Sequence, residues 1–426
     1  MKTFLPLTPV ILSIFFSLFP IYGTEETLPT ESETSSSPKP ETNSNSEKQE
    51  NSFTNAFAVN SALVQKPVTA LLADGTAYNG LLLADYRQEN GKGVTAIQER
   101  DGRITVIHSE NLIDLSSCSD PFKPMTQEEL GESLLQELGA GYYLHTTKHF
   151  VFVHQTSSSY AVWCGKLFES LYQAFCYYEQ RRGFELKDPE FPMGVVLLPN
   201  RQAFNEYAAK EMSSSAGIAA YFNRGTNRVT LYDFSEEETS RGALQKKKRT
   251  KSDIEEFLAR PEAAQIVTTV IHEATHQIAF NRGLFQRSGP YPLWAVEGLS
   301  MFFEVPDARS AKGWSFRGTK GKPNLLRLTD LRQTLRADSE DPIREIIREE
   351  RFNSNLLRSY SISWGLYFYL QSKEPQKLAK YLKLTASKDP YAAYPSDERV
   401  ADFEECFGND WKKLYKNFYK FIDSLK

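Results

Sequence analysis

Cysteine is scarce in this chain of 426 residues, which holds four. Cys164 and Cys176 lie on one predicted helix, about 18 Å apart along its axis, and that separation excludes a disulfide between them. No pattern constrains Cys118 and Cys406, so their pairing stays open. None of the four has the spacing of a metal site. Any metal is therefore expected on histidine and carboxylate side chains.

A basic excess is also missing from the sequence. The formal net charge is −4, and residues 24–54 alone carry seven Glu against two Lys, a local charge of −5. The remainder of the chain therefore sums to about +1, which is −4 minus −5. Because proteins bind phosphate backbones through a clear surplus of Lys and Arg, nucleic acid is not expected as a partner.

The apolar run at the N-terminus is too short for a stable membrane span. Lys2 supplies a positive charge, residues 10–19 are apolar, and residues 21–23 offer a cleavage site. This pattern predicts a signal peptide over residues 1–23, hence a secreted or periplasmic protein with no stable membrane span after cleavage. An uncleaved anchor is the alternative. Residues 24–54 are rich in Ser, Thr, Glu, Asn and Pro, which predicts a disordered acidic linker.

Histidine is nearly as rare, with six residues, yet two of them stand four positions apart in His272-Glu273-Ala274-Thr275-His276. On an α-helix this spacing places both imidazoles on one face, with Cβ atoms about 5–6 Å apart, so both can reach one metal ion. Glu273 would lie about 100° round the helix, where it can accept a proton from a metal-bound water. The segment therefore predicts a metal site with an adjacent general base.

A competing interpretation comes from residues 266–271, a β-branched run that also suits a buried strand. The two histidines would then lie about 13 Å apart and could not share a metal ion. Pro261, followed by Glu262 and two alanines, favours a helix start instead. We therefore expect a helix.

The third ligand is expected to be a carboxylate, because no histidine follows His276. Glu297 is the candidate, in Trp294-Ala295-Val296-Glu297-Gly298, after twenty intervening residues. Residues 281–283 form a helix stop, and Pro290 and Pro292 favour a new helix just before Trp294. The sequence thus predicts a helix, a loop and a second helix that returns Glu297 to the two histidines.

H-E-x-x-H followed by W-x-x-E-G resembles the gluzincin metallopeptidases, and its second half looks most like the aminopeptidase N branch. The wider run from about Gly141 to the C-terminus resembles a family of secreted bacterial gluzincin-like proteins catalogued mainly as a domain of unknown function. The resemblance implies a Zn²⁺ ion (Zn2+) on His272, His276 and Glu297, with Glu273 as the general base.

Two features depart from this pattern. Thermolysin-like enzymes carry an acidic residue four positions after the third ligand, where this chain has Met301. Aminopeptidase N-type enzymes carry Gly-x-Met-Glu-Asn, and residues 217–223 lack the Met-Glu pair. The resemblance therefore implies zinc hydrolysis and does not extend to aminopeptidase specificity. Tyr360 resembles the tyrosine that such enzymes place one helix later, which implies a donor to the oxyanion; a packed aromatic is the alternative.

The pattern of elements predicts an α+β protein. Residues 55–120 are predicted as a small all-β, SH3-like domain of about five strands, with either a structural or a protein-contact role. Residues 125–305 are predicted as a zincin-like upper subdomain with a mixed sheet and both metal-site helices. Residues 306–426 are predicted as a helical C-terminal subdomain. The charged segment 235–260 is expected to be a loop, with a basic lid as the alternative.

These features together predict a secreted zinc metallopeptidase that acts on a peptide or protein substrate. Either of the predicted strands 217–222 and 228–232 could pair with an extended substrate, or form an ordinary sheet edge. Two alternatives stay open: a catalytically silent binding or scaffold protein, and a zinc amidase that cleaves a cell-wall bond. A scaffold has no need of the general base Glu273, and this argues against the first.

Overall fold

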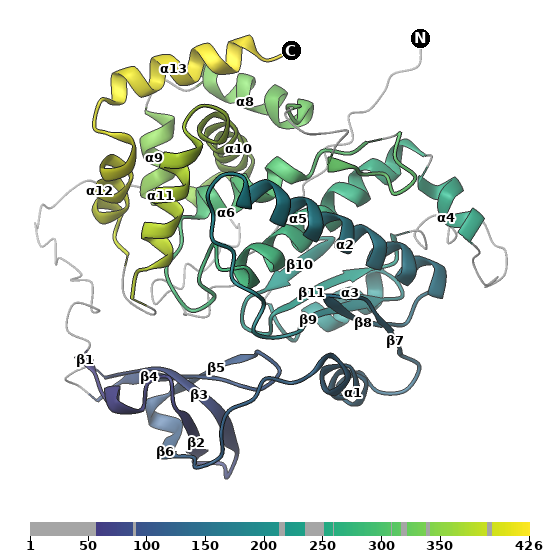
Figure 1. Ribbon diagram of the computed structural model, residues 1–426, viewed down its shortest axis with the longest axis vertical. Helices are drawn as coiled ribbons and strands as arrows, with labels where there is room; N and C mark the ends of the chain where they lie inside the picture. The colour runs from purple at the N-terminus through teal and green to yellow at the C-terminus, as the bar shows by residue number, and fades with distance from the viewer. Residues whose placement is uncertain are drawn as a thin grey trace, which may run out of the picture.

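The computed structural model describes the chain over nine ranges: residues 57–87, 91–212, 218–234, 251–258, 260–307, 309–316, 322–337, 341–389 and 394–426. The predicted signal peptide and acidic linker lie outside the described residues. The described residues have the expected α+β class, with an N-terminal antiparallel sheet, a second, mixed sheet and a helical C-terminal region (Figure 1).

Residues 57–117 form the N-terminal antiparallel sheet, which we call the β unit. Its strand path is β5-β4-β3-β2-β6, and β1 pairs with β3. Its core is small and aliphatic, as expected for a sheet of this size. The predicted antiparallel unit is confirmed, and its SH3-like character stays a prediction. The strands are β1 (Phe57–Ala58), β2 (Pro67–Leu72), β3 (Ala77–Arg87), β4 (Gly93–Gln98), β5 (Ile104–His108) and β6 (Leu112–Ser117).

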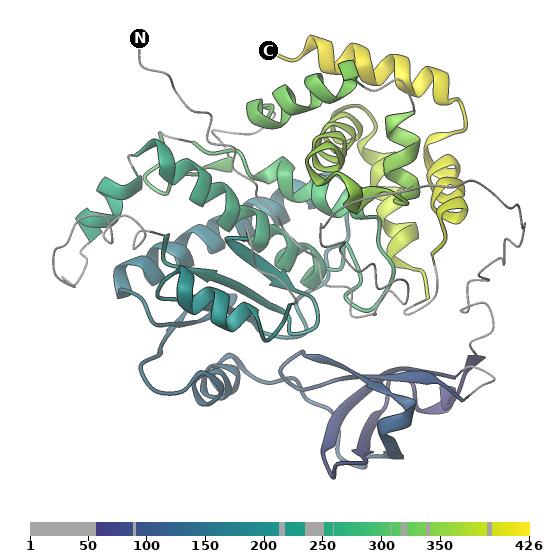
Figure 2. The same cartoon turned by 180° about the vertical axis from the view of Figure 1, so that it is seen from behind.

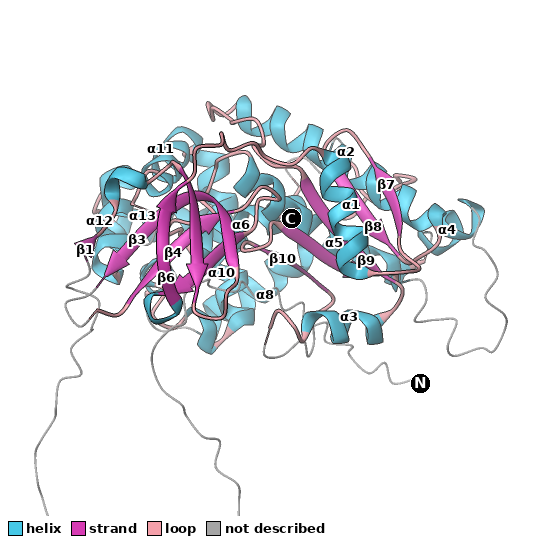
Figure 3. Ribbon diagram, turned by 90° about the horizontal axis from the view of Figure 1, so that it is seen from below, coloured by secondary structure: helices cyan, strands magenta, loops and turns pink. Residues whose placement is uncertain are grey.

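The second sheet has the strand order β10-β11-β9-β8-β7. Its central pairs, β8 with β9 and β9 with β11, are parallel, and both outer pairs are antiparallel. Figure 3 shows the two sheets as separate groups of strands. The strands are β7 (Tyr143–Thr146), β8 (Phe150–His154), β9 (Met193–Leu198), β10 (Ala220–Asn223) and β11 (Arg228–Tyr232).

Helices cover both faces of this sheet because β8 is apolar on both. Phe150 and Phe152 meet Phe168 of α2 (Ser158–Gln180), whereas Val151 and Val153 pack against α1 (Gln127–Leu138). Successive side chains of a strand point to opposite faces, so α1 and α2 lie on opposite sides. Helix α5 (Pro261–Asn281) lies on the α2 side of the sheet (Figure 1).

The C-terminal region is helical, as predicted. Figures 1 and 2 place α13 and the β unit at opposite ends of the molecule. The helices are α6 (Leu293–Phe303), α8 (Leu325–Ala337), α9 (Pro342–Arg348), α10 (Leu356–Lys373), α11 (Pro375–Ala386), α12 (Ser396–Phe407) and α13 (Trp411–Ser424).

The structure adds elements that the sequence pattern did not predict. Helix α1, strand β7 and helix α8 were not expected. The loop expected over residues 235–260 is wrong in part, because Lys251–Leu258 forms helix α4, while residues 235–250 lie outside the described residues. Helix α3 (Arg201–Ala208) begins after Asn200, whose side chain accepts a hydrogen bond from Ala203 N at 3.0 Å.

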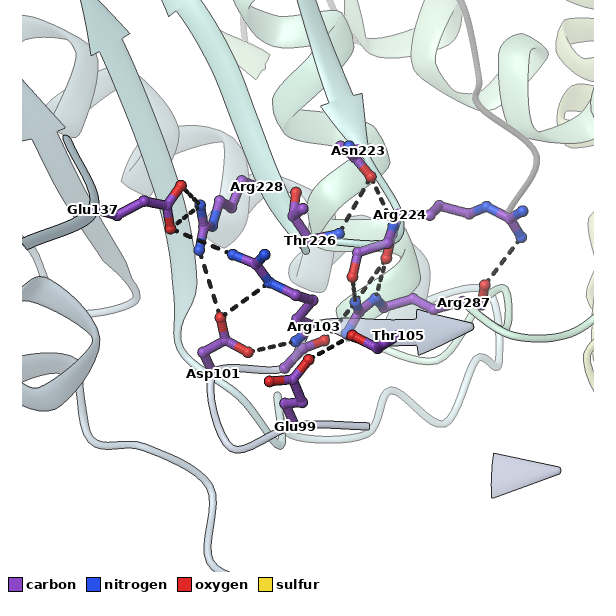
Figure 4. Close-up of polar contacts among 12 residues, drawn as sticks. Glu99, Asp101, Arg103, Thr105, Glu137, Asn223, Arg224, Thr226, Arg228 and Arg287 are labelled. Atoms are coloured by element: carbon purple, nitrogen blue, oxygen red, sulfur yellow. Dashed lines mark hydrogen bonds and ion pairs between the residues drawn. The ribbon is translucent and has the colours of Figure 1, made fainter. Parts of the chain in front are cut away.

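The β unit docks on the turn between β10 and β11 (Figure 4). Ile104 N donates to Gly225 O at 2.7 Å. Arg228, 3% exposed, pairs with Glu137 of α1 at 2.7 Å and with Asp101 at 3.5 Å. The buried guanidinium of Arg228, at the start of β11, thus holds Glu137 of α1 and Asp101 of the β unit in fixed positions. We call this contact between β11, α1 and the β unit the joint.

All four cysteines are free thiols, so Cys118 and Cys406 do not form the disulfide that the sequence left open. No helix among the described residues combines the length and the apolar character that crossing a membrane requires.

Candidate metal centre

The H-E-x-x-H segment is helical and buried within α5. Pro261 occupies the start of the helix, where its missing N–H leaves no broken hydrogen bond. Gln277 anchors the helix to the sheet by donating to Gly194 O at 2.9 Å and Asn227 O at 2.8 Å. The strand interpretation of residues 266–271 is therefore wrong. Packing against the sheet stabilises the helix despite its β-branched residues.

The third-ligand helix also forms as predicted. Helix α5 ends at Asn281, and Gly283 takes the positive φ of +79° that favours glycine after a helix. Helix α6 begins at Leu293, directly after Pro292, and carries Glu297 one turn in. Its exposed fraction is 1%, so Glu297 faces the interior of the molecule.

His272, His276 and Glu297 bring one ligand atom each to a common point. These atoms all lie within 4.8 Å of one another. Glu297 Oε2 is 3.2 Å from His272 Nε2 and 3.9 Å from His276 Nε2. A tetrahedral metal with bonds of about 2.0–2.2 Å spaces its ligand atoms about 3.3–3.6 Å apart. The group could therefore hold a metal ion.

The outer nitrogens of both imidazoles are engaged by other side chains. His272 Nδ1 donates to Glu304 Oε2 at 3.0 Å. His276 Nδ1 lies 2.9 Å from Ser300 Oγ. Because a carboxylate only accepts, the proton of a neutral His272 sits on Nδ1, and its Nε2 lone pair faces Glu297. Partners of this kind orient metal-binding histidines.

Glu304 is itself held from α8. Its Oε1 accepts from Arg327 Nε at 3.0 Å and from Asn324 Nδ2 at 3.2 Å. Both residues lie at the start of α8, so this helix supports His272 through Glu304. An acidic partner therefore exists although Met301 occupies the position where thermolysin-like enzymes carry one.

The electrostatics of the cluster favour a cation. Burial opposes a charge on His272, but the contacts with Glu297 and Glu304 outweigh it and raise the pKa of His272 to about 10. Burial lowers the pKa of His276 well below its usual value, and the charge of His272 adds to this. A metal ion competes with protons for the same nitrogens, so the carboxylates that favour the proton also favour a metal.

His272 Nε2 and Glu297 Oε2 are buried and face each other at 3.2 Å, and neither atom has a hydrogen bond to any other described residue. Such atoms carry a desolvation penalty that coordination would offset. The donor set of two imidazoles and one carboxylate is the set that catalytic zinc uses in several peptidases. The residues present therefore fit the metal that the sequence implies.

Glu273 is tied to the edge of the second sheet. Its Oε2 accepts from Phe222 N, on β10, at 2.9 Å, and its exposed fraction is 1%. Strand β10 pairs only with β11 among the described residues, whereas β11 is internal to the sheet. Of the two strands considered from the sequence, β10 is therefore the edge strand, and it lies beside Glu273.

Tyr360 is brought to the same place by α10. It is buried, and burial raises the pKa of Tyr360 well above its usual value, with the charges of Glu297 and Glu273 adding to the effect. Helices α6 and α10 approach closely at Gly298, where a Cβ would lie 2.6 Å from Ser363 O. The Tyr360 hydroxyl stays protonated and can donate a hydrogen bond near the cluster.

Sequence reasoning missed the groups that support the ligands. Ser300 and Glu304 follow Glu297 by three and seven positions, spacings that share a helix face, so their periodicity could have indicated them. Arg327 and Phe222 N carried no such signal, because their contacts span 23 and 51 positions of the sequence.

Comparison with known proteins supports part of the resemblance. Residues 266–392 match a family described as "Protein of unknown function (DUF1570)". The matched stretch contains both histidines, Glu273, Glu297 and Tyr360, and it is shorter than the run from about Gly141 considered above. A comparison with curated proteins finds no match to the chain. The match therefore coincides with the metal centre, and its description assigns no activity.

Proposed function

We propose that this protein is a zinc-dependent metallopeptidase of the gluzincin type. The observation that carries the proposal is the convergence of His272, His276 and Glu297 within 4.8 Å, beside the buried carboxylate of Glu273. Zinc held there would polarise a substrate carbonyl and make a water acidic near neutral pH. A purely structural zinc site is usually closed by four protein ligands, whereas this cluster has three.

The protein's own groups have distinct roles in this proposal. Glu273 accepts the proton of the attacking water and delivers it to the leaving amine. The hydrogen bond from Phe222 N fixes the position of the Glu273 carboxylate. Tyr360 donates to the oxygen that becomes negative as the carbonyl is attacked.

Strand β10 is proposed as the rim on which an extended peptide binds. No other described strand pairs with its outer edge, and a peptide strand can add to such an edge. We further propose that the protein is exported, because residues 1–23 have the pattern of a signal peptide.

The experiment compares the wild type with Glu273→Gln and Tyr360→Phe. Zinc content is measured by mass spectrometry, and hydrolysis is measured on a mixed peptide library. Wild type and Glu273→Gln should each hold about one zinc per chain, and Glu273→Gln should lose about 10²–10⁴-fold in rate. Tyr360→Phe should lose on the order of 10²-fold.

His272→Ala, His276→Ala is the control for the metal, and this double variant should lose zinc. Full rate in Glu273→Gln would contradict the assignment of the general base. A zinc-loaded wild type that cleaves cell-wall amides but no peptide would favour the amidase. One that cleaves neither would favour the scaffold.

A further inference from the structure

Arg224 is a buried cation for which the described residues offer no carboxylate. Its exposed fraction is 5%. Nη1 donates to Arg287 O at 3.0 Å, whereas Nε is buried and has no hydrogen-bond partner. A buried guanidinium without a counter-charge carries a desolvation penalty of several kcal/mol.

Three other buried arginines of the described residues pair with carboxylates, and a fourth, Arg287, donates to the backbone carbonyls of Gly102, Arg224 and Gly225. Arg228 binds Glu137 at 2.7 Å, Arg282 binds Asp188 at 2.8 Å, and Arg327 binds Glu304 at 3.0 Å. Arg224 differs from these three because its neighbours are aromatic rings and a backbone carbonyl. Cation–π contacts contribute only about 0.5–2 kcal/mol, which offsets part of the penalty.

Arg224 lies close in sequence to the edge strand β10, and its side chain contacts a residue that lies just before helix α6. It follows β10 directly, two residues after Phe222, whose N–H binds Glu273. Its guanidinium carbon lies 4.4 Å from the ring centre of Tyr291 and 5.9 Å from that of Phe280. Tyr291 stands two residues before α6, the helix that carries Glu297. Arg224 therefore lies between the rim strand and the third-ligand helix.

The side chain of Arg224 also points away from the joint with the β unit. Figure 4 shows it leaving the backbone on the side opposite Asp101, Glu137 and Arg228. Those two carboxylates are engaged by Arg228 and Arg103. Arg224 is thus not an unsatisfied member of that ion-pair network.

We propose that Arg224 binds a carboxylate of the substrate, either an acidic side chain close to the cleaved bond or the C-terminal carboxylate. The proposal rests on the proposed function, since it places an anionic subsite beside the reacting bond. A guanidinium presents donors in a fixed fork that matches a carboxylate, and the rings of Tyr291 and Phe280 hold that fork in place. A bound carboxylate would supply the missing counter-charge.

The test uses matched peptides that differ only in charge. One series exchanges Glu for Gln at each position within about three residues of the cleaved bond, and another exchanges a free C-terminus for an amide. Hydrogen bonds to charged groups contribute about 1.5–3 kcal/mol, so wild type should prefer one acidic peptide over its neutral partner by at least about 10-fold in kcat/KM. In Arg224→Met that ratio should fall to about one. In Arg224→Lys, which keeps the charge but loses the fork, it should fall between the two.

Arg332→Met is the matched control. Arg332 also donates to backbone carbonyls, Ile422 O at 3.0 Å and Leu425 O at 2.8 Å, but it lies where α8 meets the end of α13. This variant should keep the wild-type ratio. A wild-type ratio near one for every pair would overturn the proposal, and so would an unchanged ratio in Arg224→Met. If Arg224→Met does not fold, the wild-type ratio and Arg224→Lys decide.

A binding measurement separates this proposal from the proposed function. The same peptide pairs, labelled with fluorescein, are titrated with zinc-loaded Glu273→Gln protein and followed by anisotropy. If no peptide is cleaved but one acidic peptide binds at least about 10-fold more tightly than its partner, the subsite stands and the peptidase assignment fails. Equal binding of every pair overturns the subsite.

Discussion

Glu304→Gln should weaken zinc binding although Glu304 is not a ligand. In the native protein Glu304 Oε2 accepts from His272 Nδ1, and Oε1 accepts from Arg327 and Asn324. A glutamine has one accepting oxygen, and Arg327 can only donate, so that oxygen turns toward Arg327. The amide NH₂ then faces His272 Nδ1 and requires this nitrogen to accept. The proton of His272 moves to Nε2, which faces the proposed metal.

The magnitude follows from two separate effects. Loss of a hydrogen-bonded partner of a metal ligand lowers metal affinity by about 10–100-fold, which is about 1.4–2.7 kcal/mol. Removing one member of a buried ion pair destabilises a protein by about 3–5 kcal/mol, and Arg327 is 5% exposed. Zinc affinity is measured by competition with a chelator, and stability by denaturation of the metal-free protein.

The double variant Glu304→Leu, Arg327→Met separates these effects. It removes both members of the ion pair, so its stability should exceed that of Glu304→Gln, but its zinc affinity should stay low because leucine offers His272 Nδ1 no acceptor. Glu405→Gln is the matched control, since Glu405 pairs with Lys380 at 2.9 Å and both side chains are 56% exposed. Zinc affinity of Glu304→Gln within about 3-fold of wild type would refute the reasoning, which predicts at least about 10-fold.

Two further predictions concern buried carboxylates outside the ligand set. Burial raises the pKa of Glu179 from its ordinary value of 4.5 to about 8. Between these two pH values the folded protein keeps a proton that the unfolded chain has released. The free energy of unfolding should therefore fall by up to about 5 kcal/mol as the pH rises from 4.5 to 8. Glu179→Gln should remove this pH dependence of stability and stabilise the protein by roughly 3 kcal/mol at pH 7. Denaturant titrations at pH 5, 7 and 8 measure it, and an unchanged pH dependence in the variant contradicts the prediction. Glu349 has a left-handed φ of +61°, accepts from Leu293 N at 2.6 Å at the start of α6, and pairs with Arg399 at 2.8 Å. Glu349→Gly relieves the backbone strain but removes the acceptor for Leu293 N, so it should weaken zinc binding more than Glu349→Gln does. If Glu349→Gly is more stable and binds zinc as tightly as Glu349→Gln, Glu349 stabilises only its own turn and does not support α6.

The predicted ligands could be found because their chemistry is carried by residue type and short spacing. His272, Glu273 and His276 lie within one helical turn, and Pro292 marks the start of the helix that carries Glu297. The structure brings these groups together, and their roles as ligands and general base remain proposals.

The supporting groups could not be found in the same way, because they depend on long-range packing. Helix α8 follows a stretch rich in Gly, Lys and Arg, which hid its first turn and therefore Arg327. Strand β7 is largely exposed and lacks the alternation that indicates a strand. The contact of Phe222 with Glu273 uses a backbone N–H, and a backbone group leaves no trace in residue identity.

Residues far from the H-E-x-x-H segment in sequence fix the positions of His272 and Glu273 in the candidate metal centre. His272 is oriented through Glu304 by α8, and Glu273 is held by the edge strand β10. The turn that follows β10 is fixed in turn by the β unit, through the hydrogen bond from Ile104 N to Gly225 O. A displacement of the β unit would therefore shift the turn and strand β10, and through the hydrogen bond from Phe222 N it would shift Glu273. Because general-base catalysis requires placement within hydrogen-bond reach, the β unit belongs to the geometry of the proposed reaction even though none of its side chains lies among the proposed ligands.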